Sequence, residues 1–217
     1  MTTFVLVPGA GGSASYWRSL VPELERRGHG ALAVGLPAAD PDAGLDAYAG
    51  TVVDTVRAAL GGSPDPVVLV GQSMGGLTAP LVCDRLPVRL LVLLNAMVPR
   101  PGETGGAWWS ATGHPDPGDT TEAFFHDVPA DVAAEVQAEP FEQTGRPFED
   151  PWPLDRWPDV PTRVLAGRDD RFFPPAFQRR VAADRLGVGV DEVPGGHLVA
   201  LSRPVELAER LVAYLTG

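Results

Sequence analysis

The chain has 217 residues, a formal net charge of −11, and no lysine among its 17 basic residues. Its apolar fraction of 44% and charged fraction of 21% are ordinary for a folded protein, which excludes disorder as the dominant state. The negative charge argues against nucleic acid as a partner, because phosphates would be repelled.

Short apolar runs alternate with amphipathic stretches along most of the chain. We expect strands at residues 4–7, 31–34, 67–70, 90–94, 163–166 and 188–193. Helical spacing predicts helices at residues 16–27, 45–60, 74–85, 175–186 and 204–215. This alternation indicates an α/β fold with a mostly parallel sheet covered by helices on both faces. Ligands of such sheets bind at the carboxyl ends of the strands.

The segment 96–159 interrupts this alternation. It is rich in proline, glycine, tryptophan and acidic residues, and only 131–138 has a fair helical pattern. We expect it to be a lid insertion over the strand ends, within a single domain that spans residues 1–217.

The third expected strand is followed by Gly71-Gln72-Ser73-Met74-Gly75. This is the G-x-S-x-G pattern, and its position between an apolar strand and a helix is the context that identifies a nucleophile elbow. The serine has to project from a sharp turn, and the flanking glycines let strand and helix approach closely. The alternative is a glycine-rich turn that contains an incidental serine.

With this motif in place, the chain resembles the α/β-hydrolase superfamily along nearly its whole length. The N-terminal run from Phe4 to Gly12, the pair Tyr16-Trp17 and the pair Phe177-Gln178 resemble its branch of hydroxynitrile lyases and plant methylesterases. The resemblance implies an α/β-hydrolase fold of about six strands, without the first two of the full eight.

The resemblance also implies an oxyanion hole built from two backbone N–H groups. One donor is the residue after the nucleophile, Met74, and the other is Ala10 in the glycine-rich loop after the first strand. A nucleotide-binding loop is the alternative for that loop. However, no lysine follows it, and Ala14 stands where a dinucleotide-binding motif needs its third glycine.

A base for Ser73 has to come from a loop at the same edge, and His197 follows the last expected strand. His29, His114 and His126 are the other histidines. We expect His114 and His126, which lie in the insertion, either to contact substrate or to lie on the surface. The acid should follow the strand at 163–166, where the family spacing selects Asp170 and leaves Asp169 as the alternative.

The pocket is harder to predict. Eight aromatic side chains of the insertion either line an apolar pocket or anchor the lid to the body. The residues we expect at the pocket are Gly9, Met97, Trp108, Trp109, Phe124 and Leu198. No His, Cys or Asp cluster has the spacing of a metal site, so we expect neither metal nor cofactor.

These features favour a serine hydrolase that acts on a small, relatively apolar carboxylic ester or lactone. One alternative is non-hydrolytic chemistry on the same triad, such as a lyase, a C–C bond hydrolase or a cyclase. Another is a ligand receptor. Hydroxynitrile lyase activity is disfavoured, because that branch has a lysine and a threonine where this chain has Leu198 and Gly9.

The first residues have no basic leader, and no stretch approaches the roughly 20 apolar residues of a membrane span. Cys83 is the single cysteine, which suits a reducing compartment. We therefore expect a cytoplasmic location and a small-molecule partner, with no membrane association; the oligomeric state stays open.

Overall fold

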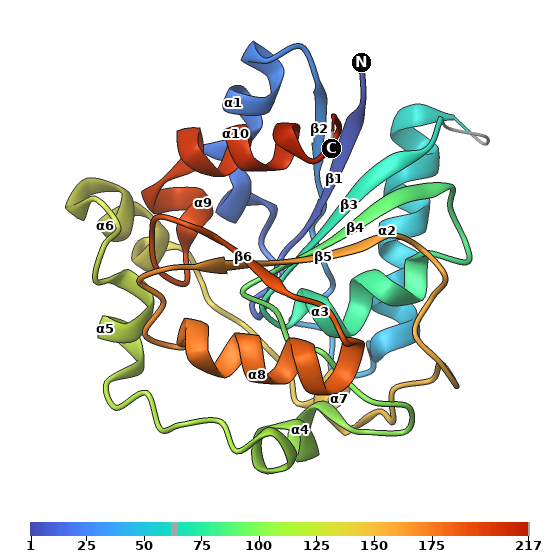
Figure 1. Ribbon diagram of the computed structural model, residues 1–217, viewed down its shortest axis with the longest axis vertical. Helices are drawn as coiled ribbons and strands as arrows, with labels where there is room; N and C mark the ends of the chain where they lie inside the picture. Colours follow the sequence, from blue (N-terminus) through green and yellow to red (C-terminus); the bar gives the residue numbers. More distant parts are fainter. Residues whose placement is uncertain (62–64, 217) are drawn as a thin grey trace.

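A six-stranded sheet forms the centre of the molecule in the computed structural model, which describes residues 1–61 and 65–216 (Figure 1). The strand order is β2-β1-β3-β4-β5-β6, and every neighbouring pair is parallel. The strands are β1 (Thr3–Val7), β2 (Gly30–Ala33), β3 (Val67–Gln72), β4 (Val88–Leu94), β5 (Thr162–Gly167) and β6 (Val190–Val193). All six predicted strands are present, and the mostly parallel α/β sheet is confirmed.

Helices cover both faces of this sheet (Figure 1). Those of the regular alternation are α1 (Leu20–Arg26), α2 (Leu45–Leu60), α3 (Gly75–Thr78), α8 (Pro175–Leu186), α9 (Val199–Ser202) and α10 (Pro204–Ala213). Two short 3₁₀ helices, η1 (Ala14–Trp17) and η2 (Ala79–Val82), accompany them.

The alternation of side chains along β1 explains why an apolar cluster lies on each face of the sheet. Phe4 and Leu6 belong to an apolar cluster with α1, α9 and α10, whereas Val5 and Val7 belong to a cluster with α2, α3 and α8. Successive side chains of a strand point to opposite faces, so a wholly buried strand has to be apolar on both sides. The continuous apolar runs of the sequence are therefore the strands at the centre of the sheet.

Three predicted helices differ from their expected bounds. The last one ends at Ala213 instead of residue 215, and proline explains the other two differences. The helix expected at 16–27 begins only at Leu20, because Pro22 lacks the N–H that an interior position requires and fits the first turn. The helix expected at 74–85 is divided into α3 and η2, with Pro80 near the start of the second part. By contrast, α2 and α8 have the bounds expected from their spacing.

The segment 96–159 contains four helices, of which the sequence pattern predicted only the third: α4 (Gly105–Thr112), α5 (Thr120–Phe125), α6 (Ala130–Ala138) and α7 (Arg146–Glu149). The first two begin at side-chain caps, where Thr104 accepts from the Ala107 amide and Asp119 accepts from the Glu122 amide. In the described part of the chain, none of the helices is both long and apolar enough to cross a bilayer.

Candidate active site

Ser73 lies at the carboxyl end of β3, on the sharp turn that leads from β3 into α3. Its φ is 51°, in the left-handed region that few non-glycine residues occupy. Backbone hydrogen bonds hold the turn: the Ser73 carbonyl accepts from the Gly76 amide at 3.0 Å and from the amide of Met97, which follows β4, at 2.9 Å. A Cβ at Gly75 would lie 2.7 Å from the Pro8 carbonyl oxygen, so the elbow requires glycine there.

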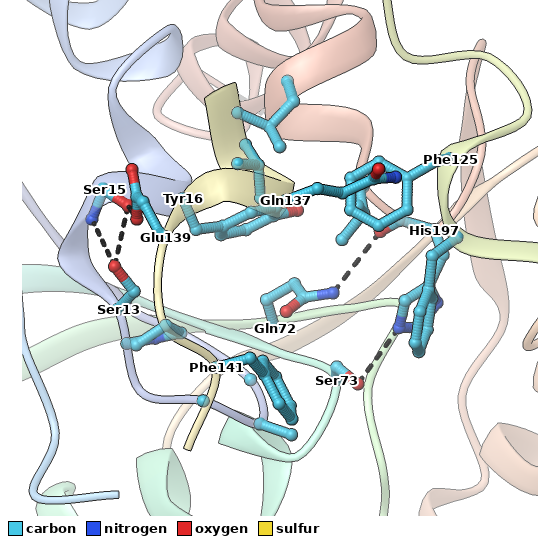
Figure 2. Close-up of a pocket in the computed structure, with 18 of the residues that line it drawn as sticks. Ser13, Ser15, Tyr16, Gln72, Ser73, Phe125, Gln137, Glu139, Phe141 and His197 are labelled. Carbon is cyan, nitrogen blue, oxygen red and sulfur yellow. Dashed lines mark hydrogen bonds between the residues drawn. The ribbon is translucent and has the colours of Figure 1, made fainter. Parts of the chain in front are cut away.

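His197 connects Ser73 to a buried carboxylate. Its Nε2 lies 3.0 Å from Ser73 Oγ, and its Nδ1 lies 2.9 Å from Asp170 Oδ2 (Figure 2 shows the serine contact). An ionised carboxylate can only accept hydrogen bonds, so the ring proton of neutral His197 belongs on Nδ1. Nε2 is then left as an acceptor for the Ser73 hydroxyl proton, which is the tautomer that base catalysis needs.

Hydrogen bonds in the loop after β5 show which of the two candidate acids faces His197. Asp170 Oδ1 accepts from the amides of Phe172 and Phe173, both at 2.8 Å, and this fixes its other oxygen toward His197. Asp169 instead accepts from the Gly195 amide and is half exposed. The structure therefore brings Asp170, not Asp169, to the histidine.

Aromatic rings enclose the imidazole of His197. The rings of Phe124, Phe172 and Phe173 have centroids 4.9 to 5.2 Å from it. These rings leave the histidine almost without solvent contact, at 1% exposure. In such a dry site, the electrostatic interaction with Asp170 is screened less than in water.

The glycine-rich loop after β1 packs directly on the elbow. A Cβ at Gly9 would lie 2.8 Å from the Ser73 Cβ, so this position is restricted to glycine. Ala10 lines the cavity next to it, and Met74 directly precedes α3 as its N-cap residue. Within residues 1–61 and 65–216, neither the Ala10 nor the Met74 amide donates to another protein group. Neither amide is therefore committed to a protein acceptor, although Met74 itself is buried and only Ala10 of the two is among the residues that line the cavity.

A cavity of about 420 Å³ opens beside Ser73 and His197. Much of its wall is apolar, contributed by Tyr16, Phe124, Phe125, Val136, Pro140, Phe141, Leu198 and Leu201 (Figure 2). Of the six residues expected at the pocket, Gly9, Phe124 and Leu198 are in this wall.

The other three expected pocket residues lie elsewhere, which corrects the prediction. Met97 and Trp108 are in the core, with exposures of 1% and 0%, and the Trp108 indole donates to the Val98 carbonyl at 3.0 Å. Trp109 packs against the same core cluster. The aromatics of the insertion therefore divide between the two roles considered: some anchor the segment to the body, and Phe124, Phe125 and Phe141 line the cavity.

The remaining histidines have distinct surroundings, and none is among the residues that line the cavity. His114 lies in an aromatic cluster behind the acid loop and contacts the Phe172 carbonyl at 2.7 Å; its burial lowers its pKa from the ordinary 6.5. His29 packs edge-on against Phe4. His126 places Nε2 close to Gly196, where an added Cβ would lie 2.7 Å from it.

Asn95, the only asparagine of the chain, was not predicted as a site residue. It follows β4 with φ 45° and is fully buried. Its amide donates to the carbonyls of Gly196 and His197, both at 3.1 Å, and its Oδ1 accepts from the Gly167 amide at 2.7 Å. Asn95 thereby ties the histidine loop to the start of the acid loop. Its position at the end of a central strand was the one sequence signal for such a role.

Asp127 was also missed. It follows α5, and its Oδ2 accepts from the Gly196 amide at 2.8 Å, next to His197. A Cβ at Gly196 would lie 2.6 Å from Asp127 Oδ1, so Asp127 packs closely enough on Gly196 to leave no room for a side chain there. Sequence gave no signal for it, because the partners are 69 residues apart and no pattern relates them.

The comparison with known families agrees with this geometry. Residues 4–210 match the model of the alpha/beta hydrolase family, so the chain belongs to that family. The resemblance noted from the sequence is confirmed.

Among curated relatives, a probable esterase (PIR7A) of Oryza sativa is 37% identical over 112 residues, which are 48% of this chain and 42% of the rice protein. This match thus spans less than half of that relative. A pyrethroid hydrolase of Sphingobium wenxiniae is 27% identical over 99% of this chain and 88% of its own length. Among solved structures, the Arabidopsis methylesterase MES16 has a TM-score of 0.81 at 21% identity, covering 100% of this chain and 99% of that one.

Proposed function

We propose that this chain is a serine hydrolase that cleaves small, relatively apolar carboxylic esters or lactones through an acyl-enzyme. The observation that carries the proposal is the chain of contacts from Ser73 Oγ through His197 to Asp170 beside an open cavity. The names of the relatives, among them probable esterase and pyrethroid hydrolase, support ester hydrolysis as the reaction class.

In the first half of the proposed reaction, His197 Nε2 takes the Ser73 hydroxyl proton while Oγ attacks the ester carbonyl. The carbonyl oxygen becomes an oxyanion that the Ala10 and Met74 amides stabilise; removing one such donor typically costs about 3 kcal/mol. Collapse of this intermediate breaks the bond to the alcohol, which takes the proton from Nε2 and leaves.

In the second half, a water molecule gives a proton to Nε2 and attacks the acyl carbonyl. The ester bond to Ser73 breaks, the serine recovers its proton, and the carboxylic acid is released. Asp170 accepts from Nδ1–H throughout and stabilises the imidazolium that forms in each half.

We further propose that segment 96–159 is a lid within a single α/β-hydrolase domain. Phe124, Phe125 and Phe141 of this segment form part of the cavity wall, and Phe124 packs on the His197 ring. A lid of this composition favours apolar acyl or alcohol groups, because their burial releases water from apolar surface.

A panel of p-nitrophenyl esters of increasing chain length tests the proposal, with wild type, Ser73→Ala and Ser110→Ala. Ser110 is an exposed serine whose hydroxyl donates to the Ala107 carbonyl of its own helix, so it is a matched control. We expect turnover by wild type and Ser110→Ala, and a loss of about 10⁴-fold or more in Ser73→Ala.

If folded wild type hydrolyses none of the esters, or if Ser73→Ala retains full activity, the serine-hydrolase proposal is wrong. Retained ligand binding without turnover would instead favour the receptor alternative. Chemistry that needs Ser73 but releases no acid would favour a lyase or cyclase.

A further inference from the structure

The cavity has a polar wall away from the Ser73–His197 pair. Ser13, Ser15 and Glu139 line it, and Figure 2 shows them gathered on the opposite side of the view from Ser73 and His197. Ser13 and Ser15 are at the start of η1, whereas Glu139 directly follows α6 of the proposed lid. The body and the lid thus both contribute to this end of the cavity.

The directions of the hydrogen bonds in this cluster follow from the chemistry of its members. Ser15 Oγ lies 2.5 Å from Glu139 Oε2, and an ionised carboxylate can only accept, so the Ser15 proton points to Glu139. Ser13 Oγ lies 2.7 Å from Ser15 Oγ. Because Ser15 has already given its single proton, Ser13 has to be the donor of that bond. Both hydroxyl protons are therefore used inside the cluster.

Ser13 Oγ also accepts from the Ser15 amide at 3.2 Å, which uses one of its two lone pairs. What remains toward the cavity is acceptor capacity alone: the second lone pair of Ser13 Oγ and the free lone pairs of the Glu139 carboxylate. Arg18 Nη1 donates to Glu139 Oε1 at 3.2 Å and offsets the charge, but Arg18 is not among the residues that line the cavity. The Tyr16 ring lines the wall, yet its hydroxyl is buried and presents no surface to a ligand. Gln137 extends toward Phe125 in Figure 2, away from this cluster.

We propose that Ser13, Ser15 and Glu139 form a subsite for a hydrogen-bond donor, so that the substrate is an ester or lactone that carries a hydroxyl or amino group remote from its reacting carbonyl. The assignment of the carbonyl end rests on the proposed function. A remote carboxylate or phosphate is rejected, because it would meet acceptors only and the Glu139 charge.

The test measures binding rather than turnover. Ser73→Ala protein is titrated by calorimetry with three methyl esters of similar length: methyl ω-hydroxyhexanoate, methyl heptanoate and monomethyl adipate. The first ends in a hydroxyl, the second in a methyl group and the third in a carboxylate. We expect the hydroxy ester to bind about 5- to 10-fold more tightly than the heptanoate, as for a partly exposed bond to a charged acceptor. The adipate ester should bind most weakly.

Two further variants in the Ser73→Ala background locate the effect. Glu139→Ala removes the acceptor and frees the Ser15 proton, so the preference for the hydroxy ester should disappear and the adipate ester should bind better. Glu135→Ala is the matched control: Glu135 also faces Arg18, at 3.7 Å, but is not among the cavity-lining residues, and its loss should leave the preference unchanged.

The proposal is overturned if the hydroxy and methyl ends bind equally, if the adipate ester binds best, if none of the three esters binds, or if the preference survives in Glu139→Ala. These outcomes are distinct from failure of the proposed function. Hydrolysis is tested by turnover in wild type, whereas this ratio is read in a protein that lacks the nucleophile.

Discussion

Replacing Asn95 by alanine tests whether one buried amide holds the candidate site together. All the hydrogen-bonding capacity of its side chain is used: two donations to the carbonyls of Gly196 and His197, and two acceptances, from the Gly167 amide and from Gln178 Nε2 at 3.2 Å. The variant removes all four bonds from a position with no solvent access.

The size of the expected destabilisation follows from the hydrogen bonds that each partner of Asn95 keeps in the variant. Gln178 Nε2 still donates to the Phe173 carbonyl, and the His197 carbonyl keeps a long bond from Gln72. The Gly167 amide and the Gly196 carbonyl lose these contacts without a replacement, at about 1–3 kcal/mol for each buried unsatisfied group. The left-handed backbone at Asn95 adds roughly 1 kcal/mol, because alanine tolerates it less well. We expect a loss of about 3–7 kcal/mol in the free energy of unfolding.

Urea denaturation followed by circular dichroism measures this loss, with Ser110→Ala as the surface control. Asn95→Asp is the informative second variant, since it is nearly isosteric but turns an oxygen toward the two carbonyls. Burial disfavours the charged carboxyl and raises its pKa, so this variant should recover stability as the pH falls and lose it as the pH rises. A loss below about 1 kcal/mol in Asn95→Ala would refute the reasoning, because that is the scale of one ordinary hydrogen bond.

Three other predictions follow from single contacts. Asp127→Ala should lower kcat by about 10-fold with little change in KM, because the Gly196 amide beside His197 loses its acceptor; Asp127→Asn keeps an oxygen there and should restore most of the activity, and equal losses in both would contradict a positioning role. Burial lowers the pKa of His114 from 6.5, so the unfolded chain binds a proton that the folded protein resists, and stability should fall as the pH drops below 6.5. His114→Gln should flatten this dependence in urea titrations at several pH values, and an unchanged slope would count against it. Burial raises the pKa of the Cys83 thiol to about 12, so iodoacetamide should label it only on unfolding, as mass spectrometry can show; rapid labelling of the native protein would contradict its burial.

The sequence by itself determined the features that local patterns encode. The β-strands were predictable because wholly buried strands need continuous apolar residues, and α2 and α8 because their spacing and their terminal glycines are local signals. Ser73 and His197 could be proposed because the elbow motif and the loop after the last strand place them at one edge of the sheet.

Other features depended on contacts between distant segments. The choice of Asp170 over Asp169 rests on which carboxylate faces His197, and a shift of one residue along a loop reverses that direction. Trp108 and Phe124 are both aromatic residues of the same segment, yet one is core and the other lines the cavity. Their difference lies in the path of the segment 96–159, which proline-rich sequence does not reveal.

Asn95 and Asp127 show the same limit for polar groups. Each acts through hydrogen bonds to residues 69 to 102 positions away in the chain. Such bonds form only after the sheet has brought the strand ends together, because the pairing of strands, and not the residues themselves, sets which loops become neighbours. Sequence therefore determined the elements and the reacting residues, and tertiary structure decided what surrounds and holds them.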